Sequence, residues 1–211
     1  MTITIDELKQ SPLYSEELGI ALRENKERES FKWFLASLLF GGRISETIAQ
    51  NTYRTFERYS LLRPRKILDA GWDFLVNPIM REGGYVRYDG RKSTQILRDC
   101  EMLLDQYNGS VTTLHDMAKN RRDLENLLLS FYGVGPVTVN IFLRELRPYW
   151  RKSDPIPLPV VTEAAAKLGL EIGAYNRKTV EFTRIEAGLI RLKRQLNLAR
   201  GKSGGKFIRN P

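Results

Sequence analysis

The chemistry of this chain is indicated first by two glycines that interrupt an apolar stretch. Gly133 and Gly135 flank Val134, directly after an apolar helical run that ends at Phe131. Glycine allows positive φ and close approach of the backbone, and Val134 can point back into the angle between two helices. Pro136 then opens a second helix, since it lacks only an N–H that a first turn does not use. The remaining N–H groups predict an anion site.

The residues after Pro136 complete the same surface, because Val137 and Thr138 lie in the first turn of the second helix. The arrangement resembles the helix-hairpin-helix motif by which many DNA-repair proteins hold one backbone phosphate. The resemblance implies contacts with double-stranded DNA from Gly133, Val134, Gly135, Val137 and Thr138. It also implies that a monovalent cation can bind at the hairpin. Alternatively, a turn of this kind only joins two helices.

The charge of the chain favours a polyanionic partner. The 211 residues carry a net charge of +9 and a pI near 9.7, which steers a protein toward nucleic acid. After Glu186 the chain has no acidic residue. Residues 184–196 predict an amphipathic helix, and residues 201–206 predict a flexible basic tail that contacts phosphates. The alternatives are a solvated tail without a role and a pI that serves solubility alone.

Composition also excludes several classes of protein. The single Cys100 excludes an intramolecular disulfide, a four-cysteine iron–sulfur cluster and a zinc ribbon. His115 is the only histidine and cannot assemble a metal site, so we expect no metal and no cofactor except the hairpin cation. No apolar run has membrane-spanning length, and MTITIDELKQ resembles neither a signal nor a transit peptide. We expect a cytoplasmic monomer without membrane partners, associated with the nucleoid if the source is prokaryotic.

Apolar residues recur with helical spacing along almost the whole chain. Residues 30–40 are apolar on most faces, as in a central buried helix, and Gly41-Gly42 ends this helix. Ser45 is placed to cap the next helix, and the proline-rich link Asp154–Pro159 must be extended. The expected helices cover residues 30–40, 45–56, 64–77, 90–108, 114–118, 124–131, 136–146, 160–168 and 184–196. The expected fold class is therefore all-α.

Three stretches in order make a family resemblance more specific: residues 34–45 (FLASLLFGGRIS), residues 84–93 (GYVRYDGRKS) and the hairpin. They are similar to the first core helix with its DNA-inserting loop, the start of the long helix, and the hairpin of one superfamily. This is the helix-hairpin-helix superfamily of base-excision DNA glycosylases, which includes endonuclease III. The resemblance implies two helical lobes with a DNA-binding cleft between them. One is a six-helix lobe of residues 30–145, and the other combines residues 1–29 and 146–211.

The catalytic positions depart from the family pattern. Bifunctional members carry a lysine two residues after the second hairpin glycine, where it attacks the sugar C1′, but this chain has Val137 there. The family aspartate stabilises the sugar cation or activates water, and alignment on the proline-rich link puts Val161 at its position. Distance from the hairpin instead favours Asp154 as the catalytic residue, with Glu163 as a third candidate. Alternatively, Asp154 only begins the proline-rich turn.

Four further residues are candidates for contact with DNA or a base. Arg43 stands where the family inserts a wedge side chain, next to two glycines that allow close approach, and Lys92 lies in the second matched stretch. Tyr149 and Trp150, beside the proline-rich link, are the aromatic candidates for a base pocket. The alternatives are a solvated loop arginine and ordinary core aromatics.

Two functions follow from these expectations. The first is a monofunctional DNA N-glycosylase that removes a damaged base from duplex DNA without lyase chemistry at the usual lysine position. The second is a catalytically silent module that binds damaged or abasic DNA. The two are distinguished by whether a carboxylate faces the bound sugar.

Overall fold

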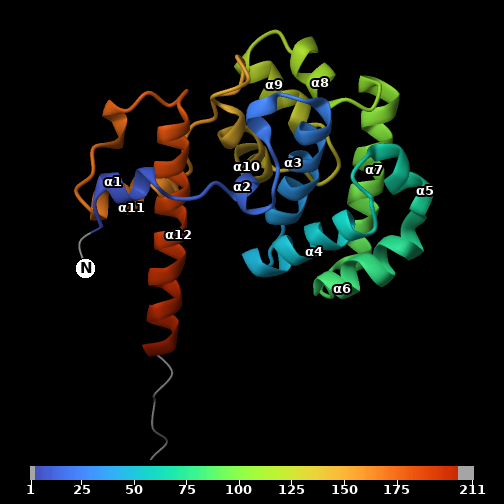
Figure 1. The fold of residues 1–211 in the computed structure, drawn as a ribbon, viewed down its shortest axis with the longest axis horizontal. Coiled ribbons are helices and arrows are strands. Elements are labelled where there is room, and N and C mark those ends of the chain that lie inside the picture. Colours follow the sequence, from blue (N-terminus) through green and yellow to red (C-terminus); the bar gives the residue numbers. More distant parts are fainter. Residues whose placement is uncertain (1–2, 204–211) are drawn as a thin grey trace, which may run out of the picture. The chain divides into compact units, whose positions relative to one another are not determined.

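The computed structural model describes residues 3–203, with side chains placed for residues 3–193. All regular structure in this range is helical, which confirms the predicted all-α class (Figure 1). The elements are α1 (Ile5–Lys9), α2 (Tyr14–Glu17), η1 (Leu22–Glu24), α3 (Glu27–Phe40), α4 (Glu46–Arg58), α5 (Pro64–Phe74), η2 (Leu75–Met80), α6 (Arg81–Gly83), α7 (Asp89–Tyr107), α8 (Val111–Met117), α9 (Arg121–Leu129), α10 (Pro136–Leu146), α11 (Pro159–Lys167), η3 (Ile172–Ala174) and α12 (Val180–Ser203).

The chain forms two compact units. The larger unit is continuous and covers Ser15–Pro155, whereas the smaller unit combines the chain up to Tyr14 with the chain from Ile156 onward. These boundaries differ from the expected ones at residues 29/30 and 145/146.

Hydrogen bonds explain why both connecting segments belong to the larger unit. The Ser15 N–H donates to Glu145 Oε2 at 3.0 Å, which binds the segment before α3 to the end of α10. The Trp150 Nε1–H donates to Asn25 Oδ1 at 3.0 Å, and the Ser153 hydroxyl donates to the carbonyl of Leu143 at 2.6 Å. The segments 15–29 and 146–155 are thus bound to α10 and to each other.

Several helix ends follow from local sequence chemistry. The side chains of Ser45, Ser110 and Asn120 accept hydrogen bonds from backbone N–H groups in the first turns of α4, α8 and α9. Pro136 and Pro159 occupy the first positions of α10 and α11. The predicted cap at Ser45 and the predicted helix start at Pro136 are confirmed, whereas α11 begins at Pro159, one residue before the expected start.

The core of the larger unit is built around α3. Phe34 lies between the two arms of the hairpin, with ring centroids 5.3 Å from Phe131 and 5.5 Å from Phe142. The neighbouring Trp33 is fully buried and donates its Nε1–H to the carbonyl of Phe142 at 3.0 Å. These contacts hold α9 and α10 against α3, so the position of the hairpin is set by the central helix.

The smaller unit packs α1 and α11 against α12. Its core contains Leu8, Val161, Ala164, Ala165, Ile185, Leu189 and Ile190. A Cβ added to Gly188 would lie 2.7 Å from the Leu8 side chain, so this glycine allows α1 to approach α12 closely. Helix α12 continues through Ser203, so the first three residues of the expected flexible tail are helical. The rest of that tail lies outside the described residues.

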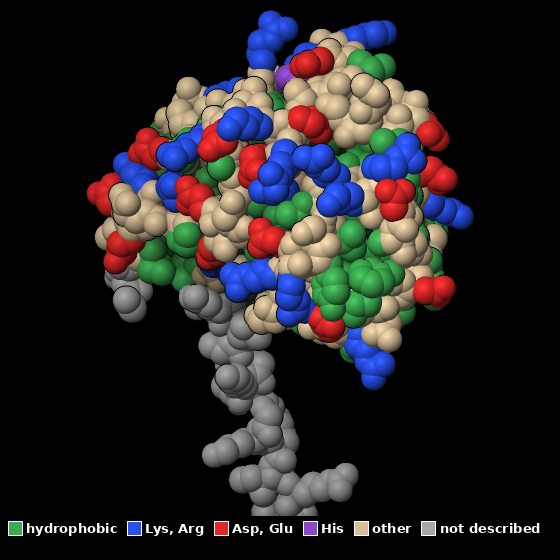
Figure 2. Space-filling view, turned by 45° about the vertical axis from the view of Figure 1, so that its right-hand side comes forward, with side chains coloured by type: hydrophobic (Ala, Val, Ile, Leu, Met, Phe, Trp, Pro, Cys, Tyr) green, Lys and Arg blue, Asp and Glu red, His purple; other side chains and the backbone are tan. Residues whose placement is uncertain are grey.

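The surface carries charges of both signs. Figure 2 shows Lys and Arg side chains interspersed with Asp and Glu side chains on the face in view. Across residues 3–203, none of the helices combines the length and the apolarity that a membrane span requires.

The end of α3 reaches the hairpin through a close contact at Gly41. A Cβ added to Gly41 would lie 2.1 Å from Thr138 Oγ1, although the φ of −71° is suited to any residue. The same construction at Gly42 would meet the Tyr85 hydroxyl at 2.5 Å. The two glycines thus allow the loop after α3 to pack against α10 and against Tyr85.

We predict that Gly41→Ala lowers the free energy of unfolding by roughly 1–3 kcal/mol, because its methyl group overpacks against Thr138. Chemical denaturation of Gly41→Ala, of Thr138→Ala and of the double variant Gly41→Ala/Thr138→Ala measures the coupling between the two positions. We expect the double variant to lose less stability than the sum of the single variants, because the clashing hydroxyl is gone. Strict additivity would contradict the contact.

Candidate functional site

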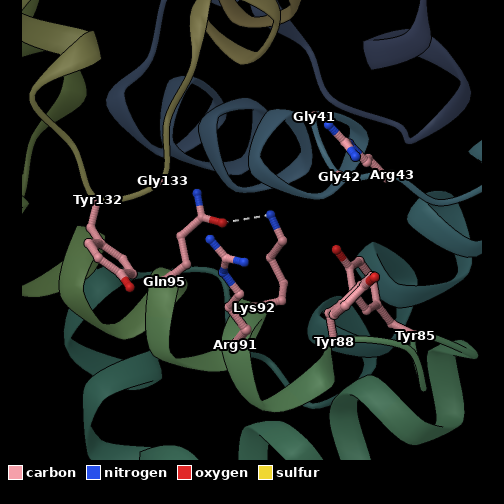
Figure 3. A pocket seen from close by; sticks show the side chains of 10 residues that line it. All are labelled: Gly41, Gly42, Arg43, Tyr85, Tyr88, Arg91, Lys92, Gln95, Tyr132 and Gly133. Carbon is pink, nitrogen blue, oxygen red and sulfur yellow. Dashed lines mark hydrogen bonds between the residues drawn. The ribbon is translucent and has the colours of Figure 1, made fainter.

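The three stretches that resemble the glycosylase superfamily meet at one pocket. This pocket has a volume of about 520 Å³ and lies entirely within the larger unit. Figure 3 shows it between the end of α3, the start of α7 and the hairpin. Its lining residues are Gly41, Gly42, Arg43, Tyr85, Tyr88, Arg91, Lys92, Gln95, Tyr132 and Gly133. Segments about 50 residues apart in the sequence thus contribute to one concave surface.

The hairpin presents backbone donors beside this pocket. The N–H groups of Gly135, Val137 and Thr138 have no acceptor within the described part of the chain. Only Gly133 has positive φ, at +70°, while Gly135 is extended with φ −107° and has open space where a Cβ would stand. Gly133 therefore uses the positive φ that glycine allows, whereas Gly135 has a backbone conformation open to other residues. Val134 is buried, as expected for a residue inside the angle.

The predicted DNA contacts divide into exposed and buried residues. Val137 is 52% exposed at the start of α10, and Arg43 is exposed at the pocket edge. Thr138 is buried beneath Gly41, where its side chain packs against the loop after α3. Its side chain therefore supports the hairpin, while its backbone N–H belongs to the row of donors.

Lys92 is the amine of the pocket and differs from an ordinary surface lysine. It is 8% exposed, and its Nζ donates to the carbonyl of Leu38 and to Gln95 Oε1, both at 2.7 Å. Figure 3 shows the second of these hydrogen bonds. It forms no ion pair with any described carboxylate. Burial lowers the pKa of Lys92 to about 8, with the nearby charge of Asp99 opposing and that of Arg91 reinforcing the effect.

Behind Lys92, the same face of α7 carries a buried acid. Gln95 and Asp99 follow Lys92 at helical spacing, and Asp99 is 0% exposed. Its carboxylate oxygens have no hydrogen-bond partner of normal geometry among the described residues. Burial raises the pKa of Asp99 to about 8, against the opposing influence of the Tyr132 backbone, Lys92 and Gln95. Asp99 thus favours its neutral, protonated form.

Aromatic rings stand at the pocket edge. Tyr88 and Tyr132 are both exposed, and a guanidinium lies over each ring: Arg87 at 4.9 Å from the Tyr88 centroid and Arg98 at 4.4 Å from the Tyr132 centroid. Tyr88 also has the left-handed backbone conformation, with φ +65°, which is uncommon for a bulky residue. Exposed rings held in place in this way can stack on a flat ligand.

The residue expected to be catalytic lies elsewhere. Asp154 is not among the lining residues of the pocket. Its carboxylate oxygens lie 3.6 Å from Arg147 Nε and 3.9 Å from Arg121 Nη1. The Arg147 side chain is fully buried and also donates to the carbonyl of Pro155 at 2.6 Å. Asp154 and Pro155 therefore both contact Arg147, and this contact lies at the end of the larger unit.

The other catalytic candidates lie in the smaller unit. Val161 is fully buried in its core, and the exposed Glu163 accepts a hydrogen bond from Lys193 Nζ at 3.2 Å. Neither residue lines the pocket.

The structure does not bring the expected aromatic pair to the pocket. Trp150 is 2% exposed, with its ring 4.6 Å from His115 and 5.6 Å from Phe142 between centroids. It is a core residue that also binds Asn25. Tyr149 is half-buried beside it and does not line the pocket.

Sequence reasoning missed five residues that the structure places at this site: Tyr85, Tyr88, Arg91, Gln95 and Tyr132. A usable signal was the polar series Lys92, Gln95 and Asp99, which puts three polar groups on one face of a helix otherwise buried along that side. Such a face is unfavourable in a core unless it lines a site.

The pocket combines three cationic side chains, three phenols and one amide, and its lining contains no carboxylate. No group of three or more potential metal ligands of the His, Cys, Asp and Glu types occurs among the described residues. The arrangement suits an anionic ligand with a flat or carbonyl-bearing part. Comparisons of the chain with models of known families, with curated proteins and with solved structures find no match.

We predict that Asp99→Asn changes the pH dependence of stability. In the folded protein Asp99 keeps its proton up to about pH 8, whereas in the unfolded chain it ionises near 3.8. The parent therefore loses stability as the pH rises from about 4 to 8, because the folded state binds more protons there. The lowered pKa of Lys92 acts in the opposite direction, but only near the upper end of this window, where the folded protein begins to lose the Lys92 proton.

Asparagine does not titrate, so the stability of Asp99→Asn relative to the parent should increase by roughly 1–3 kcal/mol between pH 5 and pH 8. Denaturant unfolding at both pH values provides the measurement. Asp105→Asn, an exposed position on the same helix, is the control. A parent-to-variant difference that stays constant with pH would contradict the raised pKa.

Proposed function

We propose that the protein binds duplex DNA through the hairpin and the pocket beside it, and that it acts as a DNA N-glycosylase on a damaged base. The observation that carries the proposal is the meeting of the three matched stretches at one cationic pocket. The expected DNA-binding cleft between two lobes is not required, because the pocket lies entirely within the larger unit.

The hairpin supports the binding of a phosphate. The N–H groups of Gly135, Val137 and Thr138 lie at the start of α10 and have no acceptor within the described part of the chain. The helix dipole also favours an anion at this end of α10. Arg43 and Arg91 are exposed at the pocket and form no ion pair with a described residue. Two free guanidiniums beside a row of backbone donors match consecutive phosphates of one strand.

The pocket supports the binding of a nucleotide taken out of the stack. Its volume of about 520 Å³ falls in the usual range for small-molecule sites, roughly 300–1,000 Å³. Tyr88 and Tyr132 place exposed rings at its edge, and bases extruded from a duplex are commonly stacked on such rings. The amide of Gln95 adds a group that can hydrogen-bond the edge of a base.

The second candidate function is a module that binds damaged or abasic DNA without removing a base. It is favoured by the lining of the pocket, which has no carboxylate, and by the contacts of Asp154 with two arginines. Hydrolysis of an N-glycosidic bond requires an anion or an activated water near the sugar. The choice between the two functions therefore depends on an assay of base release.

We predict that Gly135→Ala weakens DNA binding and leaves the fold intact. A methyl group at this position meets no protein atom within 4 Å, so the fold should be retained, and we expect the methyl group to crowd a phosphate bound at the N–H groups of the same turn. The expected loss of affinity is about tenfold, because a hydrogen bond to a charged group contributes roughly 1.5–3 kcal/mol.

Fluorescence anisotropy with a labelled duplex measures this loss, and Gly173→Ala is the matched control because a methyl group there also meets open space. For the parent, the slope of log affinity against log salt should lie between about −2 and −4. Binding that ignores salt, or equal affinities of Gly135→Ala and the parent, would count against a phosphate at the hairpin.

Base release distinguishes the two functions. If Asp154 supplies the essential negative charge, Asp154→Asn should reduce release of the damaged base by roughly 10²–10³-fold while DNA affinity is unchanged or higher. Glu163→Gln, in the smaller unit, provides the comparison. Release by the Asp154 variant at the parent rate would show that Asp154 is structural. If the parent releases no base from a broad panel of damaged duplexes, the binding-module function replaces the glycosylase.

A further inference from the structure

We propose that Lys92 Nζ is a nucleophile that condenses with the aldehyde of an abasic deoxyribose in DNA. This inference rests on the proposed function, because it assumes that an abasic nucleotide enters the pocket beside the hairpin. It goes beyond that function by assigning covalent chemistry to a residue on α7, at a distance in sequence from Val137.

The hydrogen bonds of Lys92 leave one position on the nitrogen available. A neutral amine has two hydrogens and one lone pair, arranged tetrahedrally around the nitrogen together with its carbon. Two acceptors, the carbonyl of Leu38 and Gln95 Oε1, each lie 2.7 Å from Nζ. When both hydrogens are donated to these acceptors, the lone pair occupies the remaining position, and Lys92 lines the open pocket. The close-up in Figure 3 shows the amine at the centre of the lining residues.

The surroundings of Lys92 favour this neutral form. Lys92 has no ion pair with a described carboxylate, and burial lowers its pKa to about 8. At pH 7, about one amine in ten is then neutral, against fewer than about one in a thousand for an ordinary lysine. Asp99 is a buried acid on the same helix face, and burial raises its pKa, so the negative charge that would hold a proton on Lys92 is reduced. The charge that remains opposes the lowering of the Lys92 pKa to about 8 without cancelling it.

The groups around the amine match an aldehyde that is flanked by phosphates. Arg43 and Arg91 line the same pocket as Lys92, and Gly133 links the pocket to the N–H groups of the hairpin. An abasic deoxyribose carries a C1′ aldehyde between a 5′ and a 3′ phosphate. A small phosphorylated aldehyde has the same reactive groups with a single phosphate, so the two sources must be separated by experiment.

The proposed step is a condensation that is balanced without a further reagent. The lone pair of Nζ forms a bond to C1′, and the carbonyl oxygen takes up a proton to give a carbinolamine. Loss of the second N–H proton and of the hydroxyl group, as water, then gives the imine. No oxidation occurs, and the water released is the only by-product. In this arrangement the phosphate site at the hairpin and the nucleophile come from different elements.

Borohydride trapping on the full chain tests the proposal. The parent is incubated with a duplex that contains one true abasic site, the imine is reduced to a stable secondary amine, and the modified peptide is identified by mass spectrometry. We expect the modification on Lys92. Modification of another lysine, or no modification, overturns the assignment.

Variants give a second readout. Lys92→Arg retains the positive charge and the donors but is a poor nucleophile, so trapping should fall by roughly a hundredfold or more. Lys152→Arg is the control, because Lys152 also donates to two carbonyls, those of His115 and Asp116, but lies outside the pocket. If Lys92→Arg fails to fold, peptide mapping on the parent still decides the question.

The rate of trapping should also rise with pH, with a midpoint near 8. The titratable and charged groups that face Lys92 are Asp99 and Arg91 on its own helix, with Arg43, Tyr85 and Tyr132 from the other elements of the pocket. Burial raises the pKa of Tyr85 to about 12, so this phenol does not titrate in the range. A rate that is flat between pH 6 and 9 contradicts a neutral amine as the reacting form.

Two further arms separate this inference from the proposed function. A duplex with a tetrahydrofuran abasic analogue has no aldehyde, so it reports binding alone. Binding of this duplex without an adduct on the true abasic site overturns the role of Lys92 and leaves DNA binding in place. Failure to bind this duplex contradicts the proposed function. Glyceraldehyde 3-phosphate is the small probe, and trapping of Lys92 by this probe but not by abasic DNA overturns DNA as the source of the aldehyde.

Discussion

The structure of the site depends on the packing of Phe34 between Phe131 and Phe142. These two rings come from opposite arms of the hairpin, so one side chain of α3 fixes the position of both. With the hairpin held there, Gly41 packs closely against Thr138 and the loop after α3 reaches the pocket. Aromatic contacts of this kind contribute about 0.5–1.5 kcal/mol each beyond their buried area. The geometry of the pocket is therefore set by an apolar core whose residues do not line the pocket themselves.

The second constraint is the polar face of α7. Its burial lowers the stability of the fold, whereas the aromatic packing around Phe34 raises it. Lys92, Gln95 and Asp99 are buried on a helix whose neighbouring positions pack in the core. A buried amine and a buried acid that form no direct ion pair are unfavourable for stability. Burial moves the pKa of each group to about 8. At neutral pH most Asp99 carboxyl groups are therefore protonated, while a fraction of the Lys92 amines is neutral. A surface lysine at the same pocket would bind phosphate equally well, but it would remain almost fully protonated.

The sequence predicted the parts of the fold that depend on local chemistry. Ser45 and Pro136 mark helix starts through their own side chains, and Val134 is buried as its position in the turn requires. Long-range contacts could not be predicted from local sequence. One example is Glu145, which accepts a hydrogen bond from the Ser15 N–H 130 positions away, so that the larger unit begins at Ser15. The site was anticipated in part: the three stretches were recognised, but their meeting point was not. Aromatic residues beside the proline-rich link suggested a base pocket, whereas the structure places the exposed rings at the α7 and hairpin sides.

The division of the chain into a continuous unit and a unit built from both of its ends has a consequence for biosynthesis. All residues of the continuous unit, Ser15–Pro155, emerge from the ribosome before α12 does. Domains that are continuous in sequence can form as soon as they emerge. Helix α1 is made before the continuous unit, yet Leu8 on its apolar side meets its partners on α12 only when α12 has been translated. Helix α1 thus waits for its final environment while the whole continuous unit is synthesised, and until then Leu8 is available to chaperones that bind exposed apolar side chains.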